Sequence, residues 1–242
     1  MCTLTYIPKE NGFVIGNSRD VEAERGNAIP PKQYALSDGS FAIYAKDQQS
    51  GGTWFATSEK GFTVCLLNGG FEKHIRKASY ARSRGNIPLD FLAIGNISDF
   101  IMGYDFTDIE PFTFVVFNHN LKTITDLVWT GNEAITRDYL NTEPHIWSSS
   151  TLYNSEDRLI RETWFKQHLQ YSEFQTDKLE VLKEFHNEGG ADYPNKATRI
   201  KSSRDNGPIS VSISMLQFSD SEWVMHFENL LETKNQLVRL YI

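Results

Sequence analysis

The sequence predicts an α+β protein, with strands at both ends of the chain and the longer helices between them. Alternating or continuous apolar runs typical of strands occur in the first third and again after residue 208. Two segments before that residue carry apolar side chains at helical spacing instead. Strands, then helices, then strands favour α+β layers over a doubly wound parallel sheet.

The N-terminal segment reads as a β-hairpin. Cys2–Ile7 and Phe13–Asn17 have strand character, and Lys9–Gly12 between them has the composition of a turn. Gly26–Gly39 is rich in Pro and Gly and predicts a loop. The other expected strands are Gly51–Ala56, Phe62–Leu67, Phe112–Phe117, Lys122–Trp129, Ile209–Phe218, Trp223–Phe227 and Gln236–Ile242.

Four helices are expected. Pro88 marks the start of one, and Ser98 is the expected cap of a short one over Asp99–Tyr104. Glu156–Leu169 and Thr176–Phe185 are the two longer ones. No repeat, low-complexity segment or linker divides the sequence, which predicts a single domain over residues 1–242.

Composition argues against several classes of protein. Lys and Arg total 24 against 31 Asp and Glu, a net charge of −7, and no basic stripe predicts a nucleic-acid partner. Apolar runs fall well short of the roughly 20 residues that span a bilayer. Lys9 and Glu10 interrupt the apolar opening, so no signal peptide is expected. Two cysteines make neither a disulfide framework nor a zinc site. We expect a cytoplasmic protein without a metal.

Cys2 is the candidate nucleophile. A small residue at position 2 normally allows removal of Met1, which would leave Cys2 as the first residue. Such a residue carries a thiol and a free α-amine about a hydrogen bond apart. An α-amine with a pKa of roughly 8 can take the proton of a thiol whose pKa is about 8.5. This is the design of an N-terminal-nucleophile amidohydrolase.

The segment Asn17–Asp20 ends the second strand of the hairpin and returns beside the start of the chain. Arg19 can hydrogen-bond a thiolate and lower its pKa, whereas Asp20 can bind the α-ammonium group. A solvated turn at the end of the strand explains the same polar residues equally well.

Asn68 ends an apolar strand and is followed by Gly69 and Gly70. The Asn68 side chain and backbone N–H groups of such a segment can point at one oxygen and form an oxyanion hole. A Gly-rich turn after a buried strand is the alternative interpretation.

Several motifs in this order resemble the NRDE, or transport-and-Golgi-organisation-2, family, which is similar in fold to the bile-salt and penicillin V acylases. The resemblance implies a four-layer αββα N-terminal-nucleophile fold, with Cys2 as nucleophile, Arg19 and Asp20 beside it, and Asn68 at the oxyanion. The motifs are Met1-Cys2-Thr3, Ser18-Arg19-Asp20, Gly51-Gly52-Thr53-Trp54, Leu67-Asn68-Gly69 and Ser83-Arg84-Gly85-Asn86-Ile87-Pro88.

The sequence departs from the family pattern at two places. Val21 stands where the family motif has Glu, so Glu22 or Glu24 could supply that acid. In Trp147–Leu152 the family tends to place an Asn after the first Ser, and here Ser149 or Asn154 could replace it in binding substrate.

The resemblance also implies a late arginine near the thiol. Arg204 is the candidate in preference to Arg199, because it shares a turn with Asp205, Asn206 and Gly207. Trp54 could line an apolar substrate pocket, and Gly69 lies beside the proposed oxyanion hole.

Other reactive side chains favour a structural interpretation. Cys65 lies among apolar residues and is most simply a buried hydrophobe. The six histidines are scattered, so a surface role is favoured for each, although His74 and His119 could contact a haem or a substrate.

The sequence therefore predicts an N-terminal-cysteine hydrolase that cleaves a non-peptide amide C–N bond through an acyl-enzyme on Cys2 and needs no cofactor. The alternative is a binding protein of haem trafficking or of lipid and acyl-group metabolism, with haem or a lipid as its ligand. A third interpretation is a scaffold that retains the fold without activity.

Overall fold

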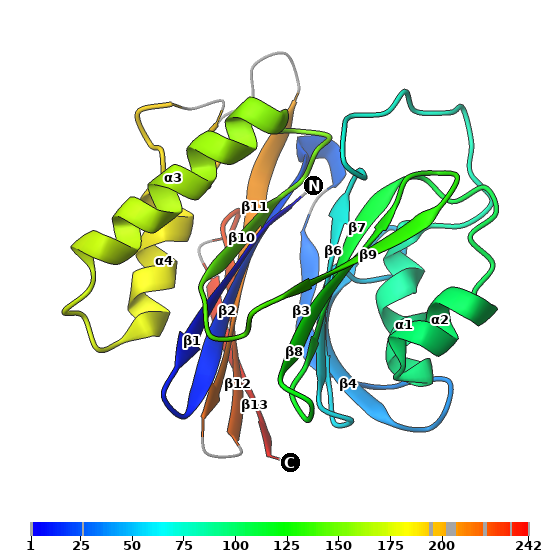
Figure 1. The fold of residues 1–242 in the computed structure, drawn as a ribbon, viewed down its shortest axis with the longest axis horizontal. Coiled ribbons are helices and arrows are strands. Elements are labelled where there is room, and N and C mark those ends of the chain that lie inside the picture. Colours follow the sequence, from blue (N-terminus) through cyan, green and yellow to red (C-terminus); the bar gives the residue numbers. More distant parts are fainter. Residues whose placement is uncertain are drawn as a thin grey trace. The chain divides into compact units, whose positions relative to one another are not determined.

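The computed structural model describes residues 2–25, 27–193, 196–201, 207–219, 222–232 and 234–241. Within it the chain divides into two compact units (Figure 1). The first unit is built from residues 1–28 and 142–242, and the second from Ile29–Asn141. Each unit contains one antiparallel sheet and two α-helices.

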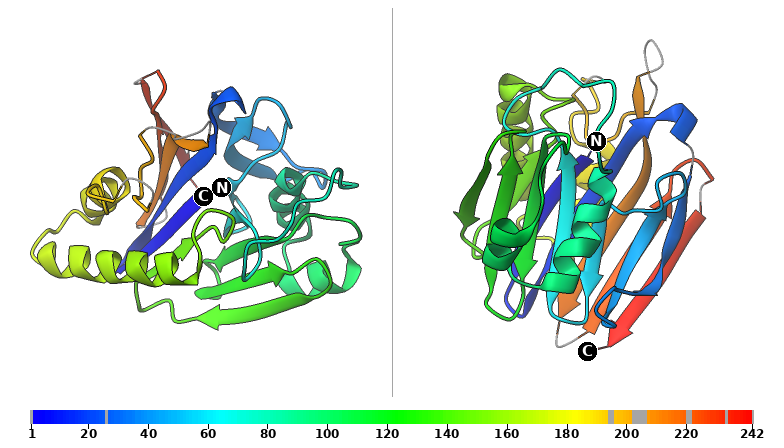
Figure 2. Two further views of the ribbon diagram at one scale, coloured as in Figure 1. Left: turned by 90° about the horizontal axis from the view of Figure 1, so that it is seen from above. Right: turned by 90° about the vertical axis from the view of Figure 1, so that its right-hand side faces the viewer.

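The sheet of the first unit has six strands in the order β10-β1-β2-β11-β12-β13. Helices α3 (Ser155–Tyr171) and α4 (Lys178–Glu188) pack on one face of it, as Figure 2 shows. The strands are β1 (Cys2–Lys9), β2 (Gly12–Glu22), β10 (His145–Ser148), β11 (Pro208–Ser219), β12 (Glu222–Asn229) and β13 (Lys234–Tyr241).

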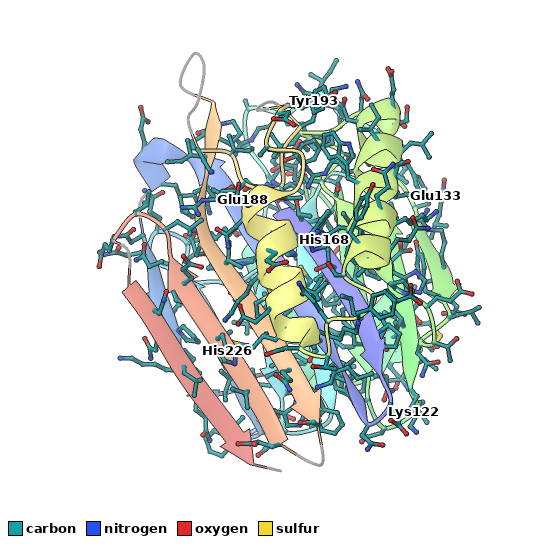
Figure 3. The ribbon with its side chains drawn as sticks, turned by 90° about the vertical axis from the view of Figure 1, so that its left-hand side faces the viewer. Lys122, Glu133, His168, Glu188, Tyr193 and His226 are labelled. Carbon is teal, nitrogen blue, oxygen red and sulfur yellow. The ribbon has the colours of Figure 1, made fainter. Side chains whose placement is uncertain are left out.

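The helix-facing side of this sheet is apolar along part of its length. Helix α4 lies in front of β2 and β11 in Figure 3 and α3 packs against β10, whereas β12 and β13 extend beyond the cover of both helices. His168 of α3 has its Nε2 atom 2.8 Å from the carbonyl oxygen of Val181 and so ties the two helices together. The buried core here comprises Ile7, Val14, Phe165, Leu179, Val181, Leu182, Phe185, Ile213 and Met215.

The second unit has a seven-stranded sheet in the sequential order β3 to β9. Helices α1 (Ile87–Ile94) and α2 (Ile97–Gly103) contribute Phe91 and Phe100 to an aromatic core that includes Phe114. The strands are β3 (Ala28–Ala35), β4 (Phe41–Asp47), β5 (Phe55–Ser58), β6 (Phe62–Asn68), β7 (Phe112–Asn118), β8 (Thr123–Trp129) and β9 (Ala134–Tyr139), and short 3-10 turns lie at Ala23–Arg25 and Arg84–Asn86.

Most expected elements are confirmed, but the loop expected over Gly26–Gly39 is wrong. Residues Ala28–Ala35 form β3, which tolerates Pro30 and Pro31 because it lies at the edge of the sheet. Strands β4, β9 and β10 were not expected from the sequence. The strand expected over Gly51–Ala56 begins only at Phe55.

The start of one helix and the end of one strand also differ from the expectation. The cap of α2 is Asn96 rather than Ser98, because the Asn96 side chain accepts hydrogen bonds from the backbone N–H groups of Ser98 and Asp99. Strand β2 continues to Glu22, so Arg19 and Asp20 belong to the strand and are not part of a terminal turn.

Gly52 allows the motif at residues 51–54 to contact the motif at residues 83–88 within the second unit. The Thr53 N–H donates to the carbonyl oxygen of Gly85 at 2.9 Å. A Cβ atom added at Gly52 would lie 2.4 Å from that same oxygen. Only a residue without a side chain permits this close backbone approach.

We predict that Gly52→Ala lowers the free energy of unfolding by about 1–3 kcal/mol, because the added methyl group overlaps backbone atoms that cannot move aside. Urea denaturation measures the loss. Gly103→Ala is the matched control, since a Cβ there meets nothing within 4 Å and the residue lies in α2. Equal stability of the Gly52 variant and the wild type would contradict the close contact.

Candidate active site

Cys2 begins β1, between β10 and β2 in the sheet of the first unit. Its register partner on β2 is Arg19, and its carbonyl oxygen accepts a hydrogen bond from the Ser149 N–H at 3.1 Å. The side chain is only 2 % exposed. The predicted hairpin thus brings Cys2 and Arg19 side by side, and the segment after β10 adds Ser149.

The environment of the Cys2 thiol keeps it protonated. Burial raises its pKa above the ordinary value, and this effect is the largest one acting on the group. The nearby charge of Asp20 also raises the pKa, whereas Arg19 and a hydrogen bond with the Asn17 side chain lower it. Because a thiol is a weak nucleophile, this cysteine needs a base to react.

Asp20 supplies a buried carboxyl group in the same part of the unit. It is 0 % exposed, and its Oδ1 atom accepts a hydrogen bond from Ser210 Oγ at 2.6 Å. Within the described part of the chain, its Oδ2 atom has no hydrogen-bond partner. Burial raises the pKa of Asp20 to about 6, although the Ser210 hydrogen bond and the charge of Arg161 oppose the increase.

Asp20 is thus the buried acid of this segment, whereas Glu22 and Glu24, the two candidates to replace the family's Glu at position 21, are both exposed. An irregularity in the pairing of β11 with β2 occurs between Ser210 and Ser212. It sets Ser210 opposite Asp20 in the register. The hydroxyl that holds the carboxylate thus depends on a local break in strand pairing.

Arg161 of α3 is a buried residue that the sequence analysis missed. It is 0 % exposed and donates to Thr3 Oγ1 at 2.5 Å, to Ser148 Oγ at 2.9 Å and to the Ala197 carbonyl oxygen at 2.9 Å. Its guanidinium group also lies 3.9 Å from the centre of the Tyr153 ring. No sequence signal separates it from the solvated arginines usual on a helix surface.

His186 of α4 corrects the expectation of a surface role for every histidine. It is 0 % exposed, with Nε2 2.7 Å from Thr5 Oγ1 and Nδ1 2.6 Å from Ser18 Oγ. Burial lowers its pKa to about 3, so the ring is neutral at neutral pH. A neutral imidazole between two hydroxyl groups ties α4 to β1 and β2.

Asn68 ends β6 in the second unit, as the sequence predicts, and Gly69 follows with a φ of 89°. The Gly69 N–H donates to the Pro111 carbonyl oxygen at 3.0 Å. The Gly69 N–H thus already has an acceptor within this unit. The contribution of Gly69 to substrate binding and that of the Asn68 side chain to an oxyanion hole remain predictions.

Trp54 also lies in the second unit, where it is buried next to the contact between Thr53 and Gly85. Arg84, which belongs to the motif at residues 83–88, contributes contacts near the same backbone. Its Nη2 atom lies 2.9 Å from Glu110 Oε2, and its Nη1 atom donates to the Pro111 carbonyl oxygen at 2.9 Å. Arg84 and the Gly69 N–H thus share the Pro111 carbonyl oxygen as acceptor, which connects the 83–88 motif to the backbone next to Asn68.

The remaining predicted residues have varied surroundings. Ser149 is buried beside Cys2, whereas Asn154 is exposed and caps α3 by accepting from the Asp157 N–H at 2.8 Å. Arg204 lies outside the described residues. Arg199 donates to Asn187 Oδ1 at 2.5 Å. Cys65 is fully buried, as expected.

In the described part of the chain, no group of three or more His, Cys, Asp or Glu side chains is arranged to hold a metal ion. None of the helices described is both long enough and apolar enough to cross a membrane.

The fold is that of the N-terminal-nucleophile hydrolases. One similar solved structure is a penicillin V acylase from Agrobacterium tumefaciens, with 8% sequence identity and a TM-score of 0.58; the match covers 100% of this chain and 86% of the other. Another is a mutant conjugated bile acid hydrolase from Clostridium perfringens, with 9% identity and a TM-score of 0.61; the match covers 100% of this chain and 92% of the other. A Caenorhabditis elegans N-acylethanolamine-hydrolyzing acid amidase ortholog is also similar, with 12% identity and a TM-score of 0.50; the match covers 89% of this chain and 92% of the other.

The sequence is more specific about the family. Residues 1–219 match the family model described as transport and Golgi organisation 2, and the chain belongs to that family. Comparison with curated protein sequences gave no match. At these identities, the likeness to the solved structures extends to the fold alone.

We predict that Asp20→Asn stabilises the protein at alkaline pH when residue 1 is retained, so that no α-ammonium group on Cys2 pairs with the carboxylate. The pKa of Asp20 is raised from 3.8 to about 6, so the wild type loses stability as pH rises from about 4 through 6. The neutral amide avoids a cost of up to about 3 kcal/mol. Urea denaturation should show that the variant's advantage is about 1 kcal/mol larger at pH 8 than at pH 5. A variant less stable than wild type at pH 8 would contradict this.

His186→Gln tests the opposite pH dependence. The pKa of His186 lies at about 3 in the folded protein, against 6.5 ordinarily, so its contribution to stability is lost as pH falls below 6.5. We expect the variant to be less stable than wild type at pH 7 and the difference to narrow by about 2 kcal/mol at pH 5. Urea denaturation at both values measures it, and a constant difference would disprove a buried neutral imidazole.

Proposed function

We propose that this protein is an N-terminal-cysteine amidohydrolase that cleaves a non-peptide amide C–N bond through an acyl-enzyme on Cys2. The observation that carries the proposal is the constellation at the start of β1. There a buried thiol pairs in register with Arg19, and Asp20 holds a buried carboxylate oxygen that lacks a partner among the described residues.

Removal of Met1 would complete this site. The new terminus would carry an α-ammonium group on Cys2, and the Oδ2 atom of Asp20 is the acceptor we assign to it. A buried carboxylate with an unused oxygen is costly unless a donor or a cation meets it. The terminal amine has both properties, and its free-base form can remove the thiol proton.

The reaction then follows with all protons accounted for. The α-amine takes the proton of the Cys2 thiol while the sulfur bonds to the amide carbon. The C–N bond breaks as the α-ammonium group gives that proton to the departing amine. Water next attacks the thioester, with the α-amine as base, and releases a carboxylic acid and the free thiol. One amide and one water thus yield one acid and one amine.

The other predicted residues have defined roles in this proposal. The Asn68 side chain would stabilise the oxyanion, and Arg204 would support the thiolate. Trp54, Ser149 and Asn154 are the proposed contacts with substrate. The four-layer αββα arrangement that the resemblance implies belongs to the same proposal.

The names of the similar structures suggest the substrate class. They are called a penicillin V acylase, a conjugated bile acid hydrolase and an N-acylethanolamine-hydrolyzing acid amidase. We therefore propose an apolar acyl group attached to a small or polar amine. No metal or cofactor takes part in the proposed steps.

The proposal predicts a mature chain without Met1 that hydrolyses an amide. We expect intact-mass spectrometry to show the loss of Met1, and turnover of at least one of penicillin V, a conjugated bile acid and an N-acylethanolamine. Cys2→Ala should abolish turnover while circular dichroism remains unchanged. Cys65→Ala is the matched control, because Cys65 is the other buried thiol and lies in the second unit.

Other outcomes distinguish the alternatives. Retention of Met1, or turnover that survives Cys2→Ala, would reject the hydrolase. Saturable binding of haem or of an acyl ligand by both wild type and Cys2→Ala, without turnover by either, would favour the carrier function instead.

A further inference from the structure

Arg161 and Asp20 are two opposite buried charges that form no ion pair with another described residue. None of the ion pairs between described residues includes either side chain. Among the described residues, the hydrogen-bond acceptors of Arg161 are neutral hydroxyl and carbonyl oxygens. Burying a guanidinium group in this way is costly unless a nearby anion balances its charge.

The contacts of Arg161 converge on the first residues of β1. One arm of the guanidinium group donates to Thr3 Oγ1, and Thr3 is the neighbour of Cys2. The Nε atom donates to Ser148 on β10, the strand paired with β1 on the side away from β2. The other arm donates to the carbonyl oxygens of Lys196 and Ala197. A single side chain of α3 thus fixes Thr3, β10 and the 196–197 segment together.

Its charge acts on Asp20 without direct contact. Arg161 is among the groups that lower the pKa of Asp20, against the stronger opposing effect of burial. A cation this near the chain start also disfavours a second positive charge there, so it favours the free-base form of a terminal amine. The effect on the amine extends the reactive state to lower pH, whereas the effect through Asp20 opposes it, because the ionised carboxylate raises the pKa of the Cys2 thiol.

We propose that Arg161 is a positioning residue for the Cys2 chemistry: it anchors the start of β1 through Thr3, and its charge sets the lower pH limit of Cys2 reactivity. This inference rests on the proposed function, because it assumes a terminal α-amine on Cys2.

Few other groups near Arg161 titrate close to neutral pH. Burial raises the pKa of Tyr153 to about 12, and the pKa of His186 is lowered to about 3, so neither changes charge between pH 5 and 9. The ionisable neighbours are Cys2 on β1, Arg19 and Asp20 on β2, Tyr153 before α3, Asp157 on α3 in an ion pair with Lys196, and His186 on α4. The titration of Cys2 reactivity thus reports mainly on Asp20 and the chain start.

The experiment measures the rate at which iodoacetamide alkylates Cys2 between pH 5 and 9, with the site identified by peptide mass spectrometry. For Arg161→Gln we expect the midpoint of the acid limb to rise by about 1 pH unit, which slows labelling about tenfold on that limb. Lys166→Gln removes a positive charge from an exposed position of the same helix and should leave the midpoint unchanged.

Arg161→Lys separates charge from packing. It retains the positive charge but loses the planar fork that reaches Thr3 and Ser148, so we expect a lower melting temperature with a midpoint near that of wild type. A Lys variant shifted by a full unit would overturn the inference, even if the Gln variant does not fold. A folded Arg161→Gln protein with the wild-type midpoint would overturn it as well.

The result also separates this inference from the proposal on which it rests. If the wild type lacks Met1 and is labelled at Cys2, but Arg161→Gln has the same labelling midpoint, then the role of Arg161 is rejected and the proposed hydrolase function stands. If the wild type retains Met1, both the role of Arg161 and the proposed hydrolase function are rejected.

Discussion

The burial of one carboxyl group constrains the whole first unit. Asp20 lies within β2 with no exposed surface, and burial opposes its ionisation. Two groups that moderate this cost come from elsewhere in the unit: Ser210 from β11, through a break in strand pairing, and the charge of Arg161 from α3. Such an arrangement is expensive for stability, which is typical of residues retained for chemistry.

The helix-facing side of the six-stranded sheet is accordingly divided in two. Toward one end it is packed by apolar side chains such as Val14, Phe165 and Leu182. Toward the start of β1 it is polar, with His186 bridging Thr5 and Ser18, and Arg161 bound to Thr3. The apolar part stabilises the unit, and the polar part holds the first residues of β1 in a fixed position. Rigid elements thus support Cys2, the proposed nucleophile, in the way that precise catalysis would require.

The hairpin could be predicted from sequence, because a short polar turn fixes which residues of β1 and β2 face each other, and this placed Arg19 beside Cys2. Arg161 and His186 could not be found, since a local pattern does not reveal which polar side chain of a helix meets the polar part of a sheet.

The prolines of β3 concealed a strand because they remove backbone donors, which matters little at a sheet edge. Gly69 fits the expected turn, but only the structure shows that its N–H is already bound.

The central claim is that a free α-amine at Cys2 completes this polar site. Nuclear magnetic resonance of protein labelled with [¹⁵N]cysteine tests it directly, because Cys65 supplies an ordinary amide signal for reference. We expect Cys2 to give an amine nitrogen signal that titrates near neutral pH and whose midpoint shifts in Asp20→Asn. A second amide signal, assigned to Cys2 and insensitive to pH, would show that residue 1 is retained and would contradict the claim.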